Sequence, residues 1–394
     1  MNKKTVEQVD VQGKKVFVRV DFNVPIKQGV VKDDTRIRES LPTLKYLLER
    51  NATLILASHL GRPKGKVNPE YSIAPAAPVL EKLLGRPVTF VDDCVGPKVQ
   101  QATANAAPGS VFLLENLRFY PGEEANDPAF AKQLASPAQV YVNDAFGTAA
   151  RAHASTVGMV SFLPTACCGF LMVKELDYLG KLLHSPEHPF SVVLGGAKIS
   201  DKIEVVQNLI KIADNLLIGG GMVYTFLASQ GYTVGDSICE RDKLDLAASI
   251  LKETKTRQMN FLMPMDHIVS QSLEQPVDMK VLPAGNIPDG LRGVDIGPGT
   301  VQQYQKILRG SKTIFWNGPM GVFEVEAFAN GTMGVAKAVA DSGATSVIGG
   351  GDSIAAVAKA GVTDKITHIS TGGGASLEFL AGEPLPGVEA LPNR

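Results

Sequence analysis

The sequence has little that would direct the chain to a membrane, to nucleic acid or out of the cell. Polar or charged residues interrupt every apolar run before it reaches the roughly 18 residues that a membrane helix needs. The 39 Lys and Arg residues balance 40 Asp and Glu residues, so no overall charge favours nucleic acid or an anionic membrane surface. The basic N-terminus lacks the apolar segment and cleavage site of a signal peptide. We therefore expect a cytoplasmic protein with no nucleic-acid or membrane partner.

Cysteine is also scarce. The four residues, Cys94, Cys167, Cys168 and Cys239, form neither a C-x-x-C pair nor a Cys/His group at zinc spacing. We expect reduced thiols in or near the core, and we assign the adjacent pair no role beyond packing.

Standard nucleotide-binding signatures are missing as well. The chain contains no G-x-x-x-x-G-K-[ST], and no G-x-G-x-x-G follows an expected strand. These absences argue against a P-loop enzyme and an ordinary dinucleotide dehydrogenase. The DFN at Asp21–Asn23 is not the DFG of protein kinases, whose partner motifs are absent too. A nucleotide, if one binds, is held in another way.

What the chain does have is length and regular apolar periodicity. Its 394 residues exceed the roughly 250–300 at which one hydrophobic core stops growing, so we expect two domains. Short apolar, β-branched runs recur, each followed by a stretch with helical periodicity, which predicts two doubly wound, Rossmann-like parallel-sheet domains of the α/β class. The runs are Val16–Val20, Leu54–Ala57, Val88–Val91, Val111–Leu114, Val140–Val142, Ser191–Leu194, Leu216–Ile218, Phe261–Met263, Thr313–Trp316 and Ser346–Ile348.

The stretch between the two sets of runs predicts a connecting helix. The segment FLMVKELDYLGKLL has helical spacing without a following strand, and SPEHP then ends it. We assign residues 1–170 to the first domain, residues 171–188 to the connecting helix and a hinge, and residues 189–377 to the second domain.

Glycine clusters follow the expected strands of the second half. Glycine lets a backbone approach a ligand closely, and the N–H groups at the next helix start form a nest for phosphate. One cluster alone would be a tight turn, but four at strand ends favour a polyphosphate site. The clusters are Gly195-Gly196, Gly219–Gly221, Gly349–Gly351 and Gly372–Gly374.

Cationic and polar side chains follow the expected strands of the first half instead. A single Arg is most often a solvated surface charge. Several at the carboxyl ends of one sheet share a crevice, and the planar guanidinium matches phosphate and carboxylate groups. The residues are Asp21–Asn23, Arg36, His59, Arg62, Arg118, Arg151 and His153. This half is predicted to bind a small polyanion.

Long motifs run in one order along the whole chain. They are RVDFNVP (Arg19–Pro25), DDTRIR (Asp33–Arg38), ASHLGRPKG (Ala57–Gly65), LLENLRFYPGEE (Leu113–Glu124), NDAFG (Asn143–Gly147), RAHAST (Arg151–Thr156), LGGAKISDK (Leu194–Lys202), WNGPMGVFE (Trp316–Glu324), VIGGGDS (Val347–Ser353) and STGGGASLE (Ser370–Glu378). In this order they closely resemble the phosphoglycerate kinase family.

The resemblance implies reversible phosphoryl transfer between 1,3-bisphosphoglycerate and MgADP, giving 3-phosphoglycerate and MgATP in glycolysis or the Calvin cycle. It implies that the first domain binds phosphoglycerate and that the second binds ATP or ADP, with Mg²⁺ as cofactor. It also implies a monomer whose last residues, 378–394, return to the first domain. The two-domain layout itself predicts closure, because substrates bound to different domains must be brought together and water kept from the acyl phosphate.

The resemblance also implies site residues, which we assign by motif. Phosphoglycerate would be bound by Asp21, Phe22, Asn23, Arg36, His59, Leu60, Gly61, Arg62, Arg118 and Arg151. The nucleotide would be bound by Lys202, Gly293, Glu324, Gly350, Gly351, Asp352 and Ser353, with Asp352 also holding the metal. The catalytic groups would be Arg36, Lys198, Gly351 and Gly374.

The chemistry suits these residue types. A carboxylate is a good leaving group, so the transfer needs alignment and charge neutralisation and not a strong base. Lys198 supplies a mobile charge and Arg36 a planar fork near the acyl oxygen. The amides of Gly351 and Gly374 are fixed donors. Asp352 suits Mg²⁺ beside phosphate oxygens, although it could also cap a helix.

Two alternatives stay open on the sequence alone. One is a phosphotransferase acting on another small acyl phosphate, against which the intact motifs of the first half argue. The other is a non-catalytic binding protein that retains the same fold, against which the retained Arg36, Lys198 and Asp352 argue. One position departs from the family pattern, because Ala150 stands where the family commonly has His. That leaves in doubt any hydrogen bond that this His would make on domain closure.

Overall fold

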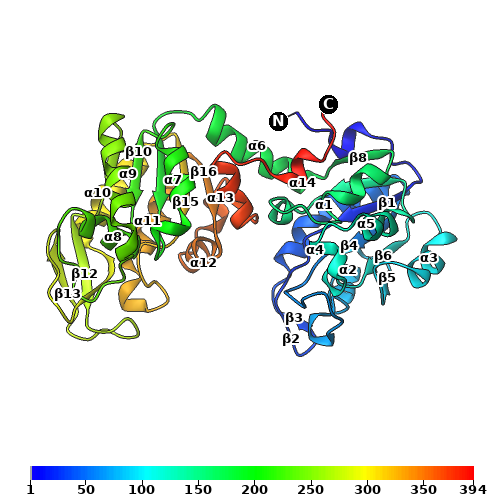
Figure 1. Cartoon of the computed structure of the whole chain (residues 1–394), viewed down its shortest axis with the longest axis horizontal. Coiled ribbons are helices and arrows are strands. Elements are labelled where there is room, and N and C mark those ends of the chain that lie inside the picture. The colour runs from blue at the N-terminus through cyan, green and yellow to red at the C-terminus, as the bar shows by residue number, and fades with distance from the viewer. Residues whose placement is uncertain (1) are drawn as a thin grey trace. The chain divides into compact units, whose positions relative to one another are not determined.

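The computed structural model describes residues 2–394, which divide into two compact units (Figure 1). The first unit comprises the chain up to Asp177 together with Pro384–Arg394, and the second comprises Tyr178–Glu383. Helix α6 (Phe170–His184), at the expected place of the connecting helix, therefore contributes residues to both units. The chain returns to the first unit at Pro384, later than the expected residue 378.

The first unit is built on a parallel six-stranded sheet in the order β5-β6-β4-β1-β7-β8. Its strands are β1 (Lys15–Arg19), β4 (Thr53–Ala57), β5 (Val88–Val91), β6 (Val111–Leu114), β7 (Val140–Asn143) and β8 (Thr165–Cys168). Strands β1, β4, β6 and β7 are buried at every position or nearly so, as both faces of the sheet are covered.

Helices pack on this sheet through apolar stripes. Ile37, Leu44 and Leu47 of α1 lie in one core cluster with Val16 and Leu54 of the sheet. The helices of the unit are α1 (Thr35–Glu49), α2 (Ala76–Leu84), α3 (Pro97–Ala104), α4 (Pro121–Glu124), α5 (Pro128–Ala135) and, in the returning tail, α14 (Pro386–Glu389). The tail is held by main-chain bonds, such as Gly387 N to Ala149 O at 2.8 Å.

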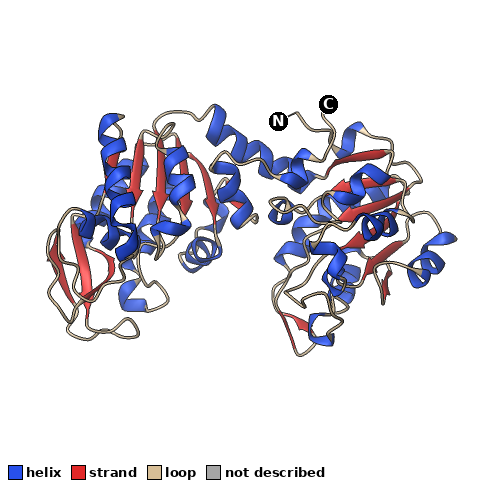
Figure 2. Ribbon diagram, viewed as in Figure 1, coloured by secondary structure: helices blue, strands red, loops and turns tan. Residues whose placement is uncertain are grey.

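The second unit repeats the architecture with a sheet in the order β11-β10-β9-β15-β16-β17, also parallel throughout (Figure 2). The strands are β9 (Phe190–Leu194), β10 (Asn215–Ile218), β11 (Asn260–Leu262), β15 (Thr313–Asn317), β16 (Thr345–Gly349) and β17 (His368–Ser370). The helices are α7 (Ile203–Leu209), α8 (Met222–Ser229), α9 (Leu244–Thr256), α10 (Pro298–Arg309), α11 (Asn330–Asp341), α12 (Gly351–Lys359) and α13 (Gly374–Leu380). The predicted fold class is confirmed, and so is the return of the tail.

Several strands were not predicted. In the second unit, β12 (Asp266–Ser270), β13 (Lys280–Pro283) and β14 (Arg292–Ile296) form a separate antiparallel sheet, which lies between β11 and β15 along the chain. In the first unit, β2 (Ile26–Lys27) pairs with β3 (Val30–Val31) as a hairpin. Strands β2, β3 and β13 are partly or largely exposed, so they lack the continuous apolar run that marks a buried strand. Strands β12 and β14 are mostly buried, but polar or charged residues interrupt their apolar residues.

The cysteines behave as expected. All four are unpaired, with Cys94, Cys167 and Cys168 buried and Cys239 partly so. Cys167 and Cys168 end the edge strand β8, which was also missed because small and polar residues begin it. In the described part of the chain, no helix combines the length and apolar character that crossing a bilayer requires.

Candidate functional site

The sheet order of the first unit brings most of its predicted ligand residues to one edge. Strands β6, β4, β1 and β7 are consecutive neighbours and parallel, so their carboxyl ends lie side by side. The segments after these four ends carry Arg118, the loop His59–Arg62, Asp21–Asn23 and Arg151 respectively.

Arg36 joins this edge from the first turn of α1. Its Nη1 donates to Oδ1 of Asp21 at 3.2 Å and to the carbonyl of Asn23 at 3.1 Å. The side chain of Arg36 is 38% exposed and that of Asp21 only 11%, so the pair fixes the guanidinium while leaving part of it accessible. A guanidinium held in this way is suited to bind an anionic oxygen of a ligand.

The loop His59–Arg62 is held from both sides. Asn23 Oδ1 accepts from Gly61 N at 3.0 Å, and Arg118 Nη1 donates to the carbonyl of Gly61 at 3.0 Å. Asn116 completes the frame, because its Oδ1 accepts from Leu60 N at 3.1 Å and its Nδ2 donates to the carbonyl of Leu60 at 2.8 Å. Asn116 was not singled out in the sequence, although it lies within the LLENLRFYPGEE motif.

Two predicted ligand residues have side chains that belong to the core. Phe22 is fully buried and Leu60 is 5% exposed. Their backbone N–H groups are taken by Ser58 Oγ, at 2.9 Å, and by Asn116 Oδ1. Phe22 and Leu60 therefore stabilise the loops at this edge, and their buried side chains are not accessible to a ligand.

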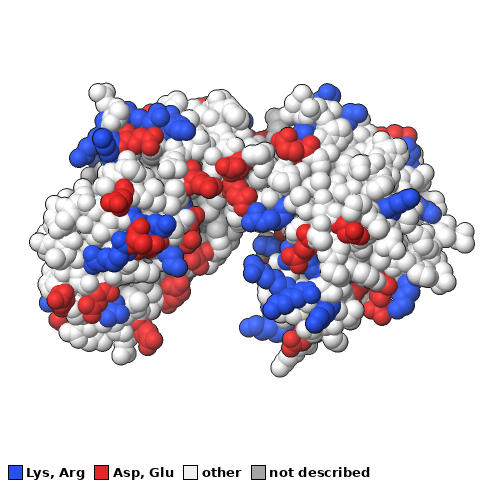
Figure 3. Space-filling view, viewed as in Figure 1, with Lys and Arg blue, Asp and Glu red and all other residues white. Residues whose placement is uncertain are grey.

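Arg62 and Arg151 are exposed, unlike the residues just described. Arg151 Nη1 donates to the carbonyl of Ala150 at 3.2 Å. Figure 3 shows Lys and Arg side chains gathered on one border of the first unit, near the hairpin β2–β3 of Figure 1. The balanced net charge therefore conceals a local cationic surface.

Burial shifts the pKa of two of these groups. The pKa of His59 is held well below its ordinary value by burial and by the guanidinium groups of Arg19 and Arg118. Burial also lowers the pKa of Arg118, an effect that nearby Glu124 opposes. The charged form of His59 is therefore disfavoured, and the arginines supply the positive charge beside it.

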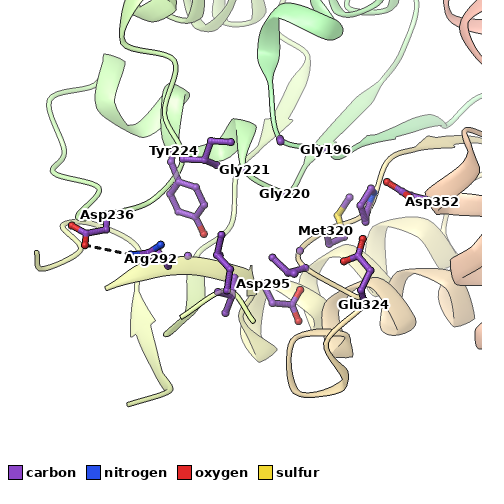
Figure 4. Close-up of a pocket in the computed structure, with 18 residues that line it drawn as sticks. Gly196, Gly220, Gly221, Tyr224, Asp236, Arg292, Asp295, Met320, Glu324 and Asp352 are labelled. Atoms are coloured by element: carbon purple, nitrogen blue, oxygen red, sulfur yellow. Dashed lines mark ion pairs between the residues drawn. The ribbon is translucent and has the colours of Figure 1, made fainter. Parts of the chain in front are cut away.

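The second unit contains a pocket of about 310 Å³ at the carboxyl ends of β9, β10 and β15 (Figure 4). Tyr224 of α8 lies in its wall beside the ion pair of Asp236 and Arg292. Ile238 and Leu273 are lining side chains with 47% and 42% of their surface exposed. A flat aromatic ring could cover these exposed apolar groups.

Glycine is required where the loops of this pocket meet. A Cβ on Gly220 would stand 2.6 Å from Gly196 N, and Gly220 has a φ of +73°. A Cβ on Gly293 would stand 1.7 Å from the Tyr224 hydroxyl. Gly293, predicted as a nucleotide residue, is thus in the pocket wall, where its N–H donates to Ser237 Oγ at 2.9 Å.

The pocket reaches polar groups at its other end. Glu324 and Asp352, both predicted nucleotide residues, line it and are exposed. Lys202 is half-buried nearby, where its Nζ contacts Oδ1 of Asn317 at the end of β15. Burial lowers the pKa of Lys202, whereas the carboxylates of Asp201 and Asp352 raise it.

The remaining predicted groups lie around helix starts. Gly351 and Gly374 are the first residues of α12 and α13, where backbone N–H groups have no partner within the helix, and both are exposed. Lys198 is exposed in the loop after β9. Ser353 is fully buried, and its Oγ accepts from Gly318 N at 2.7 Å, so it braces the loop after β15.

Asp352 fits a magnesium ion bound to phosphate oxygens. It stands in the first turn of α12, and no side-chain hydrogen bond caps this helix, whose cap is Gly350. Residues 2–394 contain no cluster of three or more His, Cys, Asp or Glu that could hold a metal unaided. Mg²⁺ commonly takes one or two carboxylates and completes its shell with phosphate and water, which matches a single exposed carboxylate here.

Sequence reasoning missed some residues of this pocket. Tyr224, Asp295 and the ion pair of Arg292 Nη2 with Asp236 Oδ2, 3.5 Å apart, lie in the wall, and Asn317 contacts Lys202. Asn317 could have been found, because it is the Asn of the WNGPMGVFE motif. Tyr224 could have been found too, because it comes shortly after the glycine cluster Gly219–Gly221. Asp236, Arg292 and Asp295 follow none of the predicted glycine clusters, and the unpredicted sheet β13-β12-β14 brings Arg292 and Asp295 to the pocket.

The chain is similar in sequence to known enzymes over its whole length. A family model described as Phosphoglycerate kinase matches residues 6–383. The curated phosphoglycerate kinase of Rubrobacter xylanophilus is 54% identical over 394 residues, covering 100% of this chain and 99% of the relative. That of Moorella thermoacetica is also 54% identical, covering 100% of both chains.

Solved structures give the same relationship. The phosphoglycerate kinase of Coxiella burnetii superposes with a TM-score of 0.91 at 39% identity, covering 98% of each chain. That of Pyrococcus horikoshii superposes with a TM-score of 0.85 at 36% identity, also covering 98% of each. These relatives give no support to the alternative of a binding protein without catalysis.

Proposed function

The chain belongs to the phosphoglycerate kinase family, and from this premise we propose how its residues divide the family's reaction between the two units. The enzyme is a phosphotransferase. It transfers a phosphoryl group reversibly between 1,3-bisphosphoglycerate and ADP, giving 3-phosphoglycerate and ATP, a step of glycolysis or the Calvin cycle.

The first unit, in this proposal, binds phosphoglycerate at the edge formed by Asp21–Asn23, Arg36, His59–Arg62, Arg118 and Arg151. Arginine forks match the carboxylate and phosphate groups of this substrate. Arg36, which is pre-positioned by Asp21, stabilises charge on the acyl oxygen. The exposed Arg62 and Arg151 bind the phosphate that is not transferred.

The second unit binds the nucleotide. The supporting observation is that one pocket runs from Tyr224 and the exposed apolar side chains Ile238 and Leu273 to Asp352 on α12. The flat base of a nucleotide could cover the apolar side chains, and its phosphates could share a cation with the carboxylate of Asp352. Glu324 would accept a hydrogen bond from the ribose, and Lys202 and the loops around Gly293, Gly350 and Ser353 would hold or frame the base and phosphates.

Magnesium is the proposed cofactor, held by Asp352 together with nucleotide phosphates. When bound, the ion neutralises phosphate charge. The chain's own catalytic groups also stabilise charge on the transferring phosphoryl group. Lys198 would bring a mobile positive charge to it, and the backbone amides of Gly351 and Gly374, at the starts of α12 and α13, would donate hydrogen bonds to it. No general base is needed, since the carboxylate leaves readily.

We further propose that the enzyme acts as a cytoplasmic monomer on these small molecules alone, without nucleic acid. The balance of 39 basic and 40 acidic residues supports the last point. Light scattering after size exclusion should give the mass of one chain, and a stable dimer would contradict the proposal.

A coupled assay of ATP formation from 1,3-bisphosphoglycerate and ADP tests the function directly. We expect turnover that needs Mg²⁺ and that falls sharply with related phosphorylated acids. A folded preparation that is inactive in this assay would overturn the assignment.

A further inference from the structure

A buried charge network lies behind His59, and no step above uses it. The side chains of Arg19, which ends β1, and Glu123, in α4, are both fully buried. Arg19 Nε donates to Ser155 Oγ at 2.8 Å, and Ser155 N donates to Glu123 Oε1 at 2.8 Å. Arg19 Nη2 is 3.9 Å from Glu123 Oε2. The buried guanidinium is therefore compensated and held in one place.

One arm of this guanidinium reaches the ring of His59. Arg19 Nη2 lies 3.1 Å from Nδ1 of His59. A guanidinium stays protonated and offers only N–H donors, so Nδ1 must be the acceptor and carries no proton. A neutral imidazole whose Nδ1 accepts has its proton on Nε2.

We propose that Arg19 is a positioning residue that fixes His59 as the Nε2–H tautomer, so that His59 presents an uncharged hydrogen-bond donor to phosphoglycerate. This rests on the proposed role of the first unit in binding that substrate. Arg19 itself is too deeply buried to touch the substrate.

The surroundings of His59 favour the same form. Besides Arg19 on β1, the groups that disfavour a charged ring are Arg118, which follows β6, Arg36 on α1 and His153, which follows β7. The nearest carboxylate of the network, Glu123, is occupied by Ser155 N and by Ser155 Oγ, the latter at 2.5 Å. The backbone of His59 is also fixed, since Ser58 Oγ donates to its carbonyl at 2.8 Å.

A neutral donor has a functional advantage at this edge. The arginines already supply the positive charge for an anionic substrate, and a charged imidazole would repel them. Because the ring stays neutral, the hydrogen bond that it donates does not change with pH across the range in which an ordinary histidine titrates.

The tautomer can be measured in the unmodified enzyme by ¹⁵N NMR of its six histidines, with His59→Asn identifying the signal. We expect Nδ1 of His59 to be unprotonated and Nε2 protonated from pH 5.5 to 8. A proton on Nδ1, or imidazolium above pH 6, would overturn the proposal. Adding 3-phosphoglycerate should shift Nε2. No shift would overturn the proposed binding site but would leave the tautomer assignment standing.

The role of Arg19 is tested by Arg19→Met combined with Glu123→Gln, which avoids an uncompensated buried carboxylate. Glu123→Gln alone is the matched control. In the double variant we expect His59 to titrate, so that the ratio of its KM for 3-phosphoglycerate to that of the control changes several-fold between pH 5.5 and 7.5. The ratio to the control removes the titration of the substrate's own phosphate, whose second pKa is about 6. Arg19→Lys keeps a charged donor and should give the pH profile of the wild type. A folded double variant with an unchanged tautomer and the control's pH profile would overturn the proposal.

Discussion

Nη1 of Arg36 lies 3.2 Å from Oδ1 of Asp21, which joins the first turn of α1 to the segment after β1. The guanidinium is therefore positioned by two elements of the sheet edge before any substrate binds. Preorganised charge of this kind contributes to catalysis because nothing has to reorganise in the transition state.

Arg36→Lys should lower kcat by about 100-fold with a smaller change in KM, because lysine keeps the charge but loses the planar fork. Steady-state kinetics with both substrates measures this. Arg38→Lys is the control, since Arg38 pairs with Asp34 at 2.9 Å and is 60% exposed. Equal losses in the two variants would contradict a specific role for Arg36.

Lys198→Ala should reduce turnover about 100- to 1,000-fold and leave the KM of both substrates nearly unchanged, since its charge acts on the transferring group. Lys211→Ala removes another exposed lysine of the second unit and should have no effect. A Lys198 variant that raised KM while keeping kcat would show that this lysine only binds.

Arg62→Ala should raise the KM for 3-phosphoglycerate roughly 10- to 100-fold, the value of a lost charge-assisted hydrogen bond, with a small change in kcat. Lys66→Ala, an exposed cation of the same loop, serves as the control. If the KM for ADP rose instead, the assignment of phosphoglycerate to the first unit would be wrong.

Asp352→Asn should raise the Mg²⁺ concentration needed for half-maximal activity by about 10-fold or more, because an amide is a weaker ligand for a hard cation. Activity is titrated with Mg²⁺ at a fixed ADP concentration. Asp364→Asn changes another exposed carboxylate of this unit and should leave the titration as it is. Identical magnesium curves for the two variants would remove Asp352 from the metal site.

Asp295 should make the stability of the second unit depend on pH. Burial raises its pKa to about 7 from an ordinary 3.8, although its oxygens accept from Ile296 N and Gly331 N. The folded unit therefore keeps a proton that the unfolded chain has lost. The stabilisation is fully present below pH 3.8 and is lost as the pH rises through about 7, by roughly 4 kcal/mol in all.

Denaturant unfolding between pH 5 and 8 tests this, with the single tryptophan, Trp316, reporting on the second unit. Relative to Asp295→Asn, the wild type should lose stability as the pH rises. The exposed Asp289→Asn should keep the wild-type profile. Parallel profiles for the wild type and Asp295→Asn would show that this carboxyl does not titrate in that range.

Much of the fold could be predicted from the sequence because buried parallel strands carry continuous apolar runs. The ten predicted runs all fall on strands of the two main sheets. Strands β8, β12, β13 and β14 were not predicted, because small, polar or exposed residues interrupt their apolar residues. Asp295, which lines the pocket from β14, was missed for the same reason.

The positions of the strands along the chain, and the residue types that follow them, were determined by the sequence itself, because both can be read from neighbouring residues. Asp21, His59 and Arg118 each follow a strand, so their common edge could be predicted. Only the tertiary structure decided which of them touch. Arg19 and His59 are 40 positions apart, and Arg19 and Ser155 are 136 apart. No local pattern encodes such contacts, since they depend on how whole strands are packed side by side.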